Sequence, residues 1–302
     1  MCNVAITRYA TARVAQASAP KQTSAGADAT AATGIVRAAL ARHGSPELVA
    51  TIASDFPLGA GLGGSSAAGV ALVAALRSFS GGEITSAKAR DEIAELSRAL
   101  EVEEMGIAGG RQDHYAASHG GALGIEFKEH TVATPIELSD LTIASLEQQC
   151  ILGYTGVSRI SGLTITAVLE SYSRGDATVL GALDSMKSLS LAMRDALANG
   201  DIEELGALVG EHWVHQRALH PAITTAKIDA IERAVSANGA IGMKALGASG
   251  GGCVMVIAPE GEEQRVRDAM MPFAQILPWR VATDGVLVGD ETGAMEKLSL
   301  DS

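Results

Sequence analysis

The chain has 302 residues, of which 47% are hydrophobic and 19% charged, so it can bury a sizeable core and is not dominated by disorder. Its 23 Lys and Arg stand against 35 Asp and Glu, and the resulting net charge of −12 argues against a nucleic-acid or anionic-membrane partner. The longest apolar stretches, such as residues 67–76, are shorter than the roughly 20 residues that a bilayer span needs. We therefore expect no membrane span.

The cysteines and the first residues bear on the cellular compartment. Cys2, Cys150 and Cys253 stand far apart, which fits neither a disulfide framework nor a zinc site and favours a reducing environment. The first 27 residues contain no acidic residue, a composition that also suits a transit peptide or a signal. Because Arg8 and Arg13 interrupt any apolar run, we expect a short strand there and a cytoplasmic protein.

The first half of the chain alternates strand patterns with helix patterns. The predicted elements are a strand near residues 4–6 that resumes at residue 9, a loop at 15–33, a helix at 34–43, a strand at 48–54, a glycine-rich loop at 55–64, a helix at 65–79, an amphipathic helix at 85–105, a glycine-rich turn at 106–114 and a strand at 121–127.

The second half begins near residue 147, where the pattern restarts. Its predicted elements are a strand at 150–154, helices between 162 and 238 with breaks at residues 200 and 220, a strand at 242–246, a glycine cluster at 247–252, a strand at 253–258, a helix at 260–270 and a strand pair near Trp279 and Val286. Strands and helices mix without a regular repeat, so the predicted fold class is α+β. We expect two domains, residues 1–147 and 148–302.

The segment PLGAGLGGSSAAG, residues 57–69, combines a glycine-rich loop with the start of a helix. Backbone N–H groups of such a loop and the positive end of the helix dipole suit a phosphate. A tight turn without a ligand is the alternative. The segment lacks the lysine of a Walker loop, and although residues 59–64 match G-x-G-x-x-G, no acidic residue closes a following strand as a dinucleotide fold requires.

Together with GASGGGC, residues 247–253, this segment resembles the second and third signature motifs of the GHMP kinases. The stretch GIAGGRQDHYAASHGGALGIEF, residues 106–127, the stretch YTGVSR, residues 154–159, and the region around Trp213 resemble the sugar-kinase branch with heptose 7-phosphate kinase and fucokinase. The resemblance covers nearly all of the chain from Asn3 onward. It implies a two-domain α+β fold, with a ribosomal protein S5 domain 2-like N-terminal domain and a ferredoxin-like C-terminal domain.

The resemblance implies ATP and Mg²⁺ as cofactors. The hydroxyl of Ser65 would coordinate Mg²⁺, with Ser66 as the alternative. Ser65 could also cap the following helix, and the two roles are compatible. Glu101 would complete the magnesium site, although Glu103 and Glu104 stand nearby and all three could form a solvated helix face. The residues implied to bind ATP are Pro57, Gly59, Ala60, Gly61, Leu62, Gly63, Gly64, Ser65, Ser66 and Ala67.

Asp113 matches the acidic residue of the family's G-x-Q-D turn, which implies that it accepts the proton of the substrate hydroxyl. An aspartate that only bonds the backbone of its turn is the alternative. The third glycine cluster is expected to close under the substrate and the phosphates. The residues implied to lie near the substrate are Gln112, His114, Gly250, Gly251 and Arg159.

One departure from the family pattern concerns the substrate. Members begin with a strand and a motif of the type P-x-R-I/V-x-F/L-x-G-G/E, whereas the first residues of this sequence resemble the segment immediately after that motif. Either the start codon was chosen too late or a natural variant binds its substrate differently. Arg8, Arg111 and Arg159 are candidates for the positive charge that the motif would place beside the catalytic carboxylate.

The sequence therefore predicts an ATP- and Mg²⁺-dependent kinase that phosphorylates a hydroxyl of a sugar or sugar phosphate, similar to heptose 7-phosphate kinase, with the anomeric hydroxyl as one candidate. A kinase or decarboxylase of the mevalonate type is one alternative, and the QDHY and YTGVSR segments favour the sugar. A GHMP-fold nucleotide-binding protein with reduced catalysis is the other. The expected partner is a small molecule, and a homodimer is left open.

Overall fold

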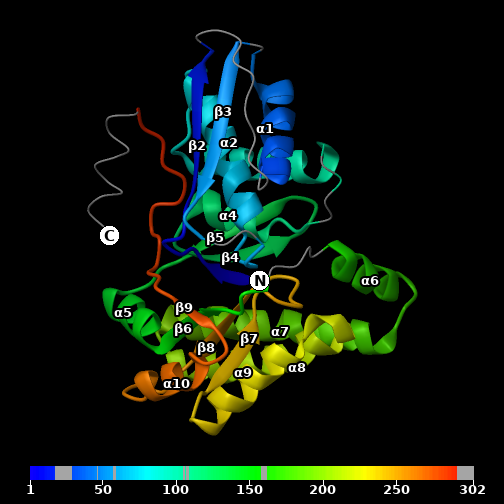
Figure 1. Ribbon diagram of the computed structural model, residues 1–302, viewed down its shortest axis with the longest axis vertical. Helices are drawn as coiled ribbons and strands as arrows, with labels where there is room; N and C mark the ends of the chain where they lie inside the picture. Colours follow the sequence, from blue (N-terminus) through cyan, green and yellow to red (C-terminus); the bar gives the residue numbers. More distant parts are fainter. Residues whose placement is uncertain are drawn as a thin grey trace. The chain divides into compact units, whose positions relative to one another are not determined.

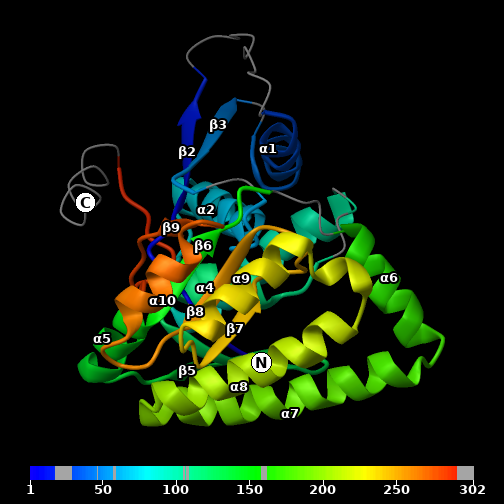
Figure 2. The same ribbon diagram turned by 60° about the horizontal axis from the view of Figure 1, so that its bottom comes forward.

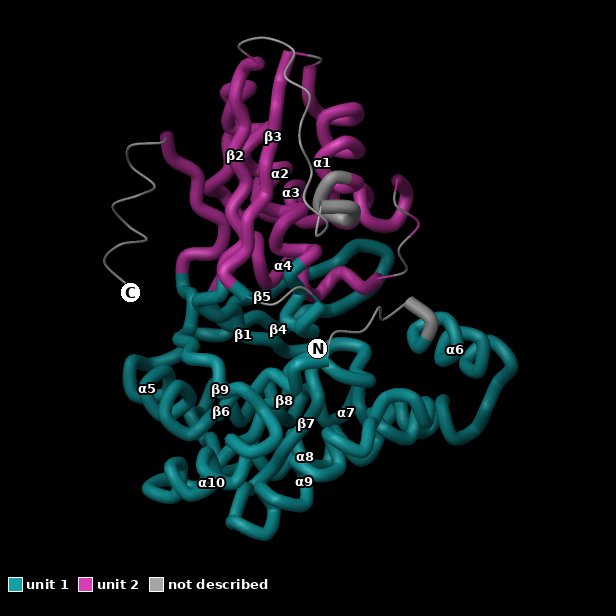
Figure 3. Tube along the Cα trace, viewed as in Figure 1, with its two compact units in different colours: residues 1–8, 56–64, 121–283 teal, residues 9–55, 65–120, 284–302 magenta. Residues whose placement is uncertain are grey.

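The computed structural model describes residues 1–17, 29–45, 47–56, 59–104, 106, 109–157 and 162–290. The chain divides into two compact units (Figure 3): unit 1 comprises Met1–Arg8, Phe56–Gly64 and Gly121–Thr283, and unit 2 comprises Tyr9–Asp55, Ser65–Gly120 and Asp284–Ser302. Neither unit is one continuous stretch, so no single cut in the sequence separates them. The domain boundary near residue 147 stays a prediction.

Unit 2 is built on an antiparallel ribbon of two strands, β2 (Ala10–Gln16) and β3 (Leu48–Ser54), with Ala10 opposite Ser54 and Gln16 opposite Leu48. Burial alternates along both strands, so one face of the ribbon packs on the core. Four helices of the unit, labelled in Figure 3, are α1 (Ala29–His43), α2 (Gly64–Phe79), α3 (Ala87–Ala99) and α4 (Gln112–His119), and the π-helix η1 (Leu100–Glu104) follows α3. Figure 1 also labels α1, α2 and α4.

The small residues of α2 let this helix lie at the centre of the unit 2 core. Its buried residues include Gly69, Val70 and Leu72, and they pack with Ile93 of α3 and with the ribbon. An ion pair of 2.7 Å between Arg77 and Glu92 joins α2 to α3 at the surface.

Unit 1 contains two sheets. The first has the order β1-β4-β5, formed by Cys2–Val4, Ala122–Phe127 and Thr131–Ile136. The second has the order β7-β8-β6-β9, formed by Gly242–Ala245, Cys253–Ile257, Cys150–Tyr154 and Gln275–Leu277, and its pairs are antiparallel. Numbered along the chain, the second sheet has the strand order 2-3-1-4, which is that of a ferredoxin-like fold read from the opposite edge, as the resemblance implied.

Helices cover both faces of the second sheet (Figure 2). Met255 and Ile257 of β8 pack with residues of α7 (Ala177–Asn199) and α8 (Ile202–Ala218), whereas Val254 and Val256 pack with residues of α9 (Ala226–Ala237) and α10 (Glu263–Met270). The remaining helical segments of the unit are α5 (Asp140–Gln149), α6 (Gly162–Ser173) and the 3₁₀ turn η2 (Pro221–Ile223). No described helix is both long and apolar enough to cross a membrane.

Several predicted bounds are wrong. The loop expected at 15–33 is too long, because β2 runs to Gln16 through its pairing with β3, and α1 begins at Ala29. The helix expected at 85–105 is α3 followed by a π-helix, and the turn expected at 106–114 already contains the start of α4. The last strand, β9, ends before Trp279, and Val286 is a buried residue outside any strand. For β2 the cause is tertiary, because pairing with β3 overrides the loop-like local composition.

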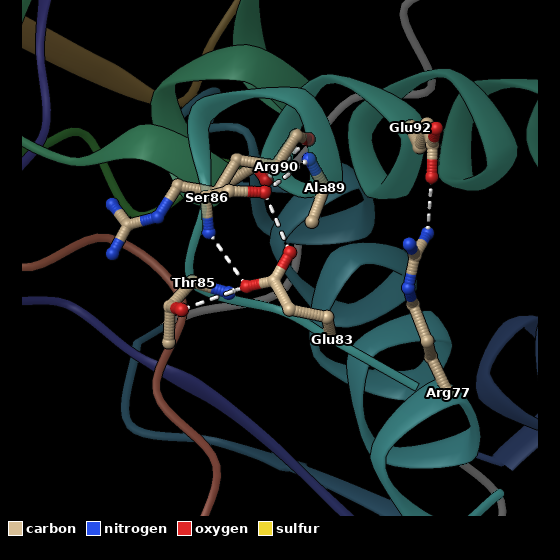
Figure 4. A network of polar contacts seen from close by, with 8 residues as sticks. Arg77, Glu83, Thr85, Ser86, Ala89, Arg90 and Glu92 are labelled. Atoms are coloured by element: carbon tan, nitrogen blue, oxygen red, sulfur yellow. Dashed lines mark hydrogen bonds and ion pairs between the residues drawn. The ribbon is translucent and has the colours of Figure 1, made fainter. Parts of the chain in front are cut away.

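The start of α3 carries a network of hydrogen bonds that predicts a pH dependence (Figure 4). The exposed carboxylate of Glu83 accepts hydrogen bonds from the backbone N–H and hydroxyl groups of Thr85 and Ser86, at 2.5 to 2.7 Å. Ser86 in turn caps α3 by accepting from the N–H of Ala89. The hydrogen bonds from Ser86 and Thr85 lower the pKa of Glu83 from 4.5 to about 2.

We expect Glu83→Gln to lower the melting temperature at pH 7, with a smaller effect near pH 2. Because the folded pKa is depressed, the stabilisation is fully present above the ordinary value of 4.5 and is lost as the pH falls towards about 2. Thermal unfolding of wild type and variant at several pH values measures this. A difference in melting temperature that is the same at pH 7 and near pH 2 would contradict the assignment.

Candidate functional site

The glycine-rich loop of residues 59–64 leads directly into α2. Gly59, Gly61 and Gly63 have φ values of 68°, 76° and 71°, so every second residue is in the left-handed region that favours glycine. Successive N–H groups in such an alternation turn towards one side and form a concavity for an anion. Pro57, the first residue predicted to bind ATP, lies outside the described residues.

The residues between these glycines anchor the loop. Ala60 is 2% exposed and belongs to an apolar cluster with Leu152, Cys253 and Leu277, and Leu62 packs against the same cluster. The side chains of Ala60 and Leu62 therefore anchor the loop on this apolar cluster. A contribution of the buried Ala60 to a nucleotide site can therefore come only from its backbone.

The third glycine cluster packs on this loop within unit 1. The N–H of Cys253 donates to the carbonyl of Ala60 at 2.7 Å. A Cβ atom on Gly252, whose φ is +77°, would lie 2.6 Å from the carbonyl oxygen of Ala60. A Cβ atom on Gly61 would likewise lie 3.0 Å from the carbonyl oxygen of Leu246. The loop of residues 59–64 and the glycine cluster of residues 247–252, far apart in the sequence, are thus packed closely against each other.

The rest of the 247–252 turn is fixed through its backbone. The N–H of Gly250 donates to the carbonyl of Ile223 at 2.8 Å, and a Cβ atom on Gly251 would lie 2.7 Å from the carbonyl oxygen of Val157. Ser249, at φ 64°, is the one non-glycine residue with positive φ in the described part of the chain, and its hydroxyl donates to the carbonyl of Ile223. Arg159 lies outside the described residues.

Unit 2 contains a buried polar cluster beside the start of α2. Ser66, Ser97, Glu101 and His114 are 7%, 0%, 5% and 1% exposed. Glu101 Oε2 lies 3.0 Å from His114 Nε2 and 3.4 Å from the hydroxyl of Ser66. Glu101 is on the π-helix η1, and single π-helical turns inside helices occur frequently at functional sites.

The structure separates the three neighbouring acidic residues. Glu103 and Glu104 are exposed and pair with Arg42 at 3.0 and 3.4 Å, so they form the solvated helix face that was the alternative. Only Glu101 of the three points into the unit. Burial alone would raise the pKa of Glu101, but hydrogen bonds from His114, Ser65 and Ser66 outweigh it and hold the pKa below its ordinary value.

The donor set suits Mg²⁺. Ser66 Oγ lies 3.4 Å from Glu101 Oε2, and the hydroxyl of the adjacent Ser65 helps to lower the pKa of Glu101. These are oxygen groups, and Mg²⁺ prefers oxygen ligands and an ionised carboxylate. Ser65 is exposed whereas Ser66 is buried. Both serines stay candidates, with the hydroxyl of Ser66 within hydrogen-bond distance of Glu101.

Asp113 lies in the first turn of α4, next to the buried cluster, and is half-buried. Burial and, to a lesser degree, the negative charge of Glu101 raise its pKa, against the opposing effects of His114 and of a hydrogen bond from Gln112. A carboxylate whose pKa is raised accepts a proton more readily than an ordinary aspartate. Asp113 lies in the first turn of a helix and not in the G-x-Q-D turn that the sequence suggested, and its role as the proton acceptor stays a prediction.

The structure corrects the interpretation of His114. The sequence placed it near the substrate, but its ring is 1% exposed and both nitrogens are engaged, Nε2 by Glu101 and Nδ1 by Ser97 at 3.0 Å. The side chain therefore belongs to the interior of unit 2. Among the candidates for the missing positive charge, Arg111 pairs with Glu95 at 3.1 Å and Arg8 donates to the carbonyl of Pro278.

Sequence reasoning missed Ser97. Its hydroxyl contacts His114, and the residue is fully buried on α3. A signal was present: Ser97 follows Ile93 by four residues, so a polar residue falls on the apolar face of an amphipathic helix. Such a residue calls for a buried partner.

Comparison with known proteins agrees with this fold. The profile of the GHMP kinases N terminal domain matches residues 29–121, and that of the GHMP kinases C terminal domain matches residues 193–274. D-glycero-alpha-D-manno-heptose 7-phosphate kinase of Campylobacter jejuni is 27% identical, over 76% of this chain and 69% of that protein. Mevalonate kinase of Pyrococcus horikoshii is 30% identical, over 79% of this chain and 68% of that protein.

A bifunctional fucokinase/GDP-fucose pyrophosphorylase of Arabidopsis thaliana is 28% identical, and the chain spans 20% of the length of that protein. Among solved structures, a D-glycero-D-manno-heptose 1-phosphate kinase from Bacteroides thetaiotaomicron superposes with a TM-score of 0.70, over 96% of this chain and 90% of that one, at 19% identity. At that identity the likeness shows the fold alone.

Fold and relatives together define a phosphotransferase of the small-molecule kinase class. The chain belongs to the GHMP kinases.

Proposed function

We propose that this protein transfers the γ-phosphate of ATP, with Mg²⁺, to a hydroxyl of a sugar or sugar phosphate. The observation that carries the proposal is the buried carboxylate of Glu101, held ionised beside the hydroxyl groups of Ser65 and Ser66 at the start of α2. An ionised carboxylate with two hydroxyls at a helix that follows a glycine-rich loop is a set of groups suited to a magnesium nucleotide.

Each group of the chain has a defined part in this proposal. The backbone N–H groups of residues 59–64 bind the phosphates, and the glycines leave them accessible. Glu101 with Ser65 or Ser66 holds Mg²⁺, which when bound neutralises charge on the transferring phosphoryl group. Asp113 accepts the proton of the attacking hydroxyl, because its raised pKa suits a base that must take up a proton.

Sugar and mevalonate acceptors are the two candidates. Support for a sugar phosphate comes from the match to heptose 7-phosphate kinase, over 244 aligned residues, and from the QDHY and YTGVSR segments. Support for a mevalonate-type acceptor comes from the 30% identity to a mevalonate kinase. We propose the sugar phosphate as the acceptor and keep mevalonate as the second candidate.

An acceptor panel tests the proposal. ADP release from Mg²⁺-ATP is measured with heptose, hexose and their phosphates, and with mevalonate and its phosphate. We expect release that depends on a sugar or sugar phosphate. Stimulation by mevalonate alone would select the second candidate. ATP binding without stimulation by any acceptor would instead support a nucleotide-binding protein with reduced catalysis.

A further inference from the structure

We propose that Ser97 and His114 are positioning residues that orient the Glu101 carboxylate for its metal, and that Gly69 is kept small to make room for Ser97. The inference rests on the proposed function, because Glu101 is a magnesium ligand only there. It assigns a role in that function to three buried residues that take no direct part in phosphoryl transfer.

The three side chains form a chain of contacts inside unit 2. The hydroxyl of Ser97, on α3, lies 3.0 Å from His114 Nδ1, on α4. His114 Nε2 lies 3.0 Å from Glu101 Oε2, on η1. Ser97 and His114 are 0% and 1% exposed, so water does not compete for these contacts. The chain of contacts therefore ties the candidate metal carboxylate to two separate helices.

The hydrogen-bond partners indicate which nitrogen of the His114 ring carries the proton. An ionised carboxylate only accepts hydrogen bonds, so His114 Nε2 must carry a proton where it meets Glu101. In the neutral ring Nδ1 is then an acceptor. The hydroxyl of Ser97 lies 3.0 Å from Nδ1 and 3.4 Å from the carbonyl oxygen of Ser66, and the shorter contact favours donation to Nδ1. Ser97 thus selects the tautomer and the ring orientation that keep a donor on Glu101. Outer partners of metal-bound carboxylates and imidazoles act in this way.

Gly69 supplies the independent observation. It is buried within α2, where glycine is less favourable than alanine. A Cβ atom at this position would lie 2.4 Å from the hydroxyl oxygen of Ser97, whereas it would lie 3.5 Å from the Cβ atom of Ser97. The other near atom is the terminal methyl of Ile35 at 3.2 Å, which can shift. A side chain at position 69 would therefore clash with the hydroxyl oxygen of Ser97, but not with the Cβ atom of Ser97.

The experiment measures metal binding directly. Mn²⁺ is titrated into the full chain in the presence of a non-hydrolysable ATP analogue, and free Mn²⁺ is followed by electron paramagnetic resonance, with Mg²⁺ as competitor. Thermal unfolding is recorded for the same proteins. The variants are Ser97→Ala, Gly69→Ala, the double variant of both, and Glu101→Gln. Ser118→Ala is the matched control, because Ser118 is also fully buried and loses a hydrogen bond, to the carbonyl of Arg90 at 2.7 Å.

We expect Ser97→Ala to weaken Mn²⁺ binding by about 10-fold, the lower end of the effect of removing an outer partner of a metal ligand, because Ser97 acts on Glu101 through His114. Ser118→Ala should lower the melting temperature to a comparable extent and leave Mn²⁺ binding unchanged. Gly69→Ala should lower the melting temperature and weaken binding, because its methyl group displaces the hydroxyl of Ser97. The double variant should regain stability, since the clash is gone, but not Mn²⁺ affinity.

The outcomes separate the inference from the proposed function. If wild type binds no Mn²⁺, or Glu101→Gln binds it as well as wild type, the metal assignment of the proposed function is wrong and the inference fails with it. If Glu101→Gln loses binding while Ser97→Ala retains it, the function stands and the positioning role is wrong. Recovery of both stability and affinity in the double variant would show that Ser97 and Gly69 serve packing only.

Discussion

Asp113→Asn is expected to lower kcat for the best acceptor by about 10² to 10⁴-fold, the usual contribution of a positioned proton acceptor. The amide keeps the shape of the side chain and removes the base. Because the loss arises in the transition state, KM for ATP should stay within a few-fold of wild type. Steady-state kinetics of ADP release at saturating Mg²⁺-ATP measure both quantities.

The raised pKa of Asp113 gives this prediction a pH signature. The base must be ionised to work, so wild-type kcat should fall as the pH drops through a pKa above the ordinary value of 3.8, and the residual activity of the variant should lack that limb.

Stability gives the control. Because folding raises this pKa, the ionised carboxylate opposes folding at neutral pH, and the effect vanishes below pH 3.8. Asp113→Asn should therefore leave the melting temperature at pH 7 unchanged or raise it. A clear loss of stability together with unchanged kcat would mean that Asp113 has a structural role in α4.

Gly252→Ala is expected to abolish most ATP binding, although Gly252 lies outside the loop that we propose to bind ATP. The new Cβ atom would lie 2.6 Å from the carbonyl oxygen and 2.9 Å from the carbonyl carbon of Ala60, so the backbone of the 59–64 loop must move. A displacement of about 1 Å can cost on the order of 10²-fold in a reaction that depends on positioning. Calorimetric titration with Mg²⁺-ATP measures the affinity.

Gly261→Ala is the matched control for Gly252→Ala. Gly261 has φ +82°, close to the +77° of Gly252, but a Cβ atom there would meet nothing within 4 Å. The two variants share the strain of a left-handed alanine, about 1 to 2 kcal/mol, and differ only in the clash. Equal ATP affinity in the two would show that the packing of the two glycine clusters is irrelevant to the nucleotide.

The glycine positions show what could be read in advance and what could not. From the sequence, a valine at Gly61 is expected to block the phosphates and leave the fold largely intact. In the structure Gly61 has φ +76° and a Cβ atom would lie 3.0 Å from the carbonyl oxygen of Leu246. A valine there would strain the backbone and press on Leu246 and the start of the third glycine cluster, so loss of binding in that variant would not identify a phosphate contact.

The sequence by itself determined the features that depend on local pattern. Hydrophobic periodicity predicted the strand Leu48–Ser54, most of α2 and the strands Cys150–Tyr154 and Cys253–Ile257. Spacing and motif order led to the GHMP kinases, which the domain matches confirm. These features could be read because residue type, period and turn chemistry act over a few neighbouring positions.

Only the tertiary structure decided the rest, because it depends on contacts between residues far apart in the chain. Pairing with β3 extended β2 into the expected loop. Burial distinguishes Glu101 from its two exposed neighbours, and it places His114, which the sequence suggested to lie near the substrate, in contact with Glu101. The position of Ser97 on the apolar face of a helix predicts that Ser97 is buried. It does not predict that its hydrogen-bond partner is the imidazole of His114 from α4. Local periodicity does not predict which distant side chain is the hydrogen-bond partner of a buried polar residue. That pairing determines the geometry of the candidate site.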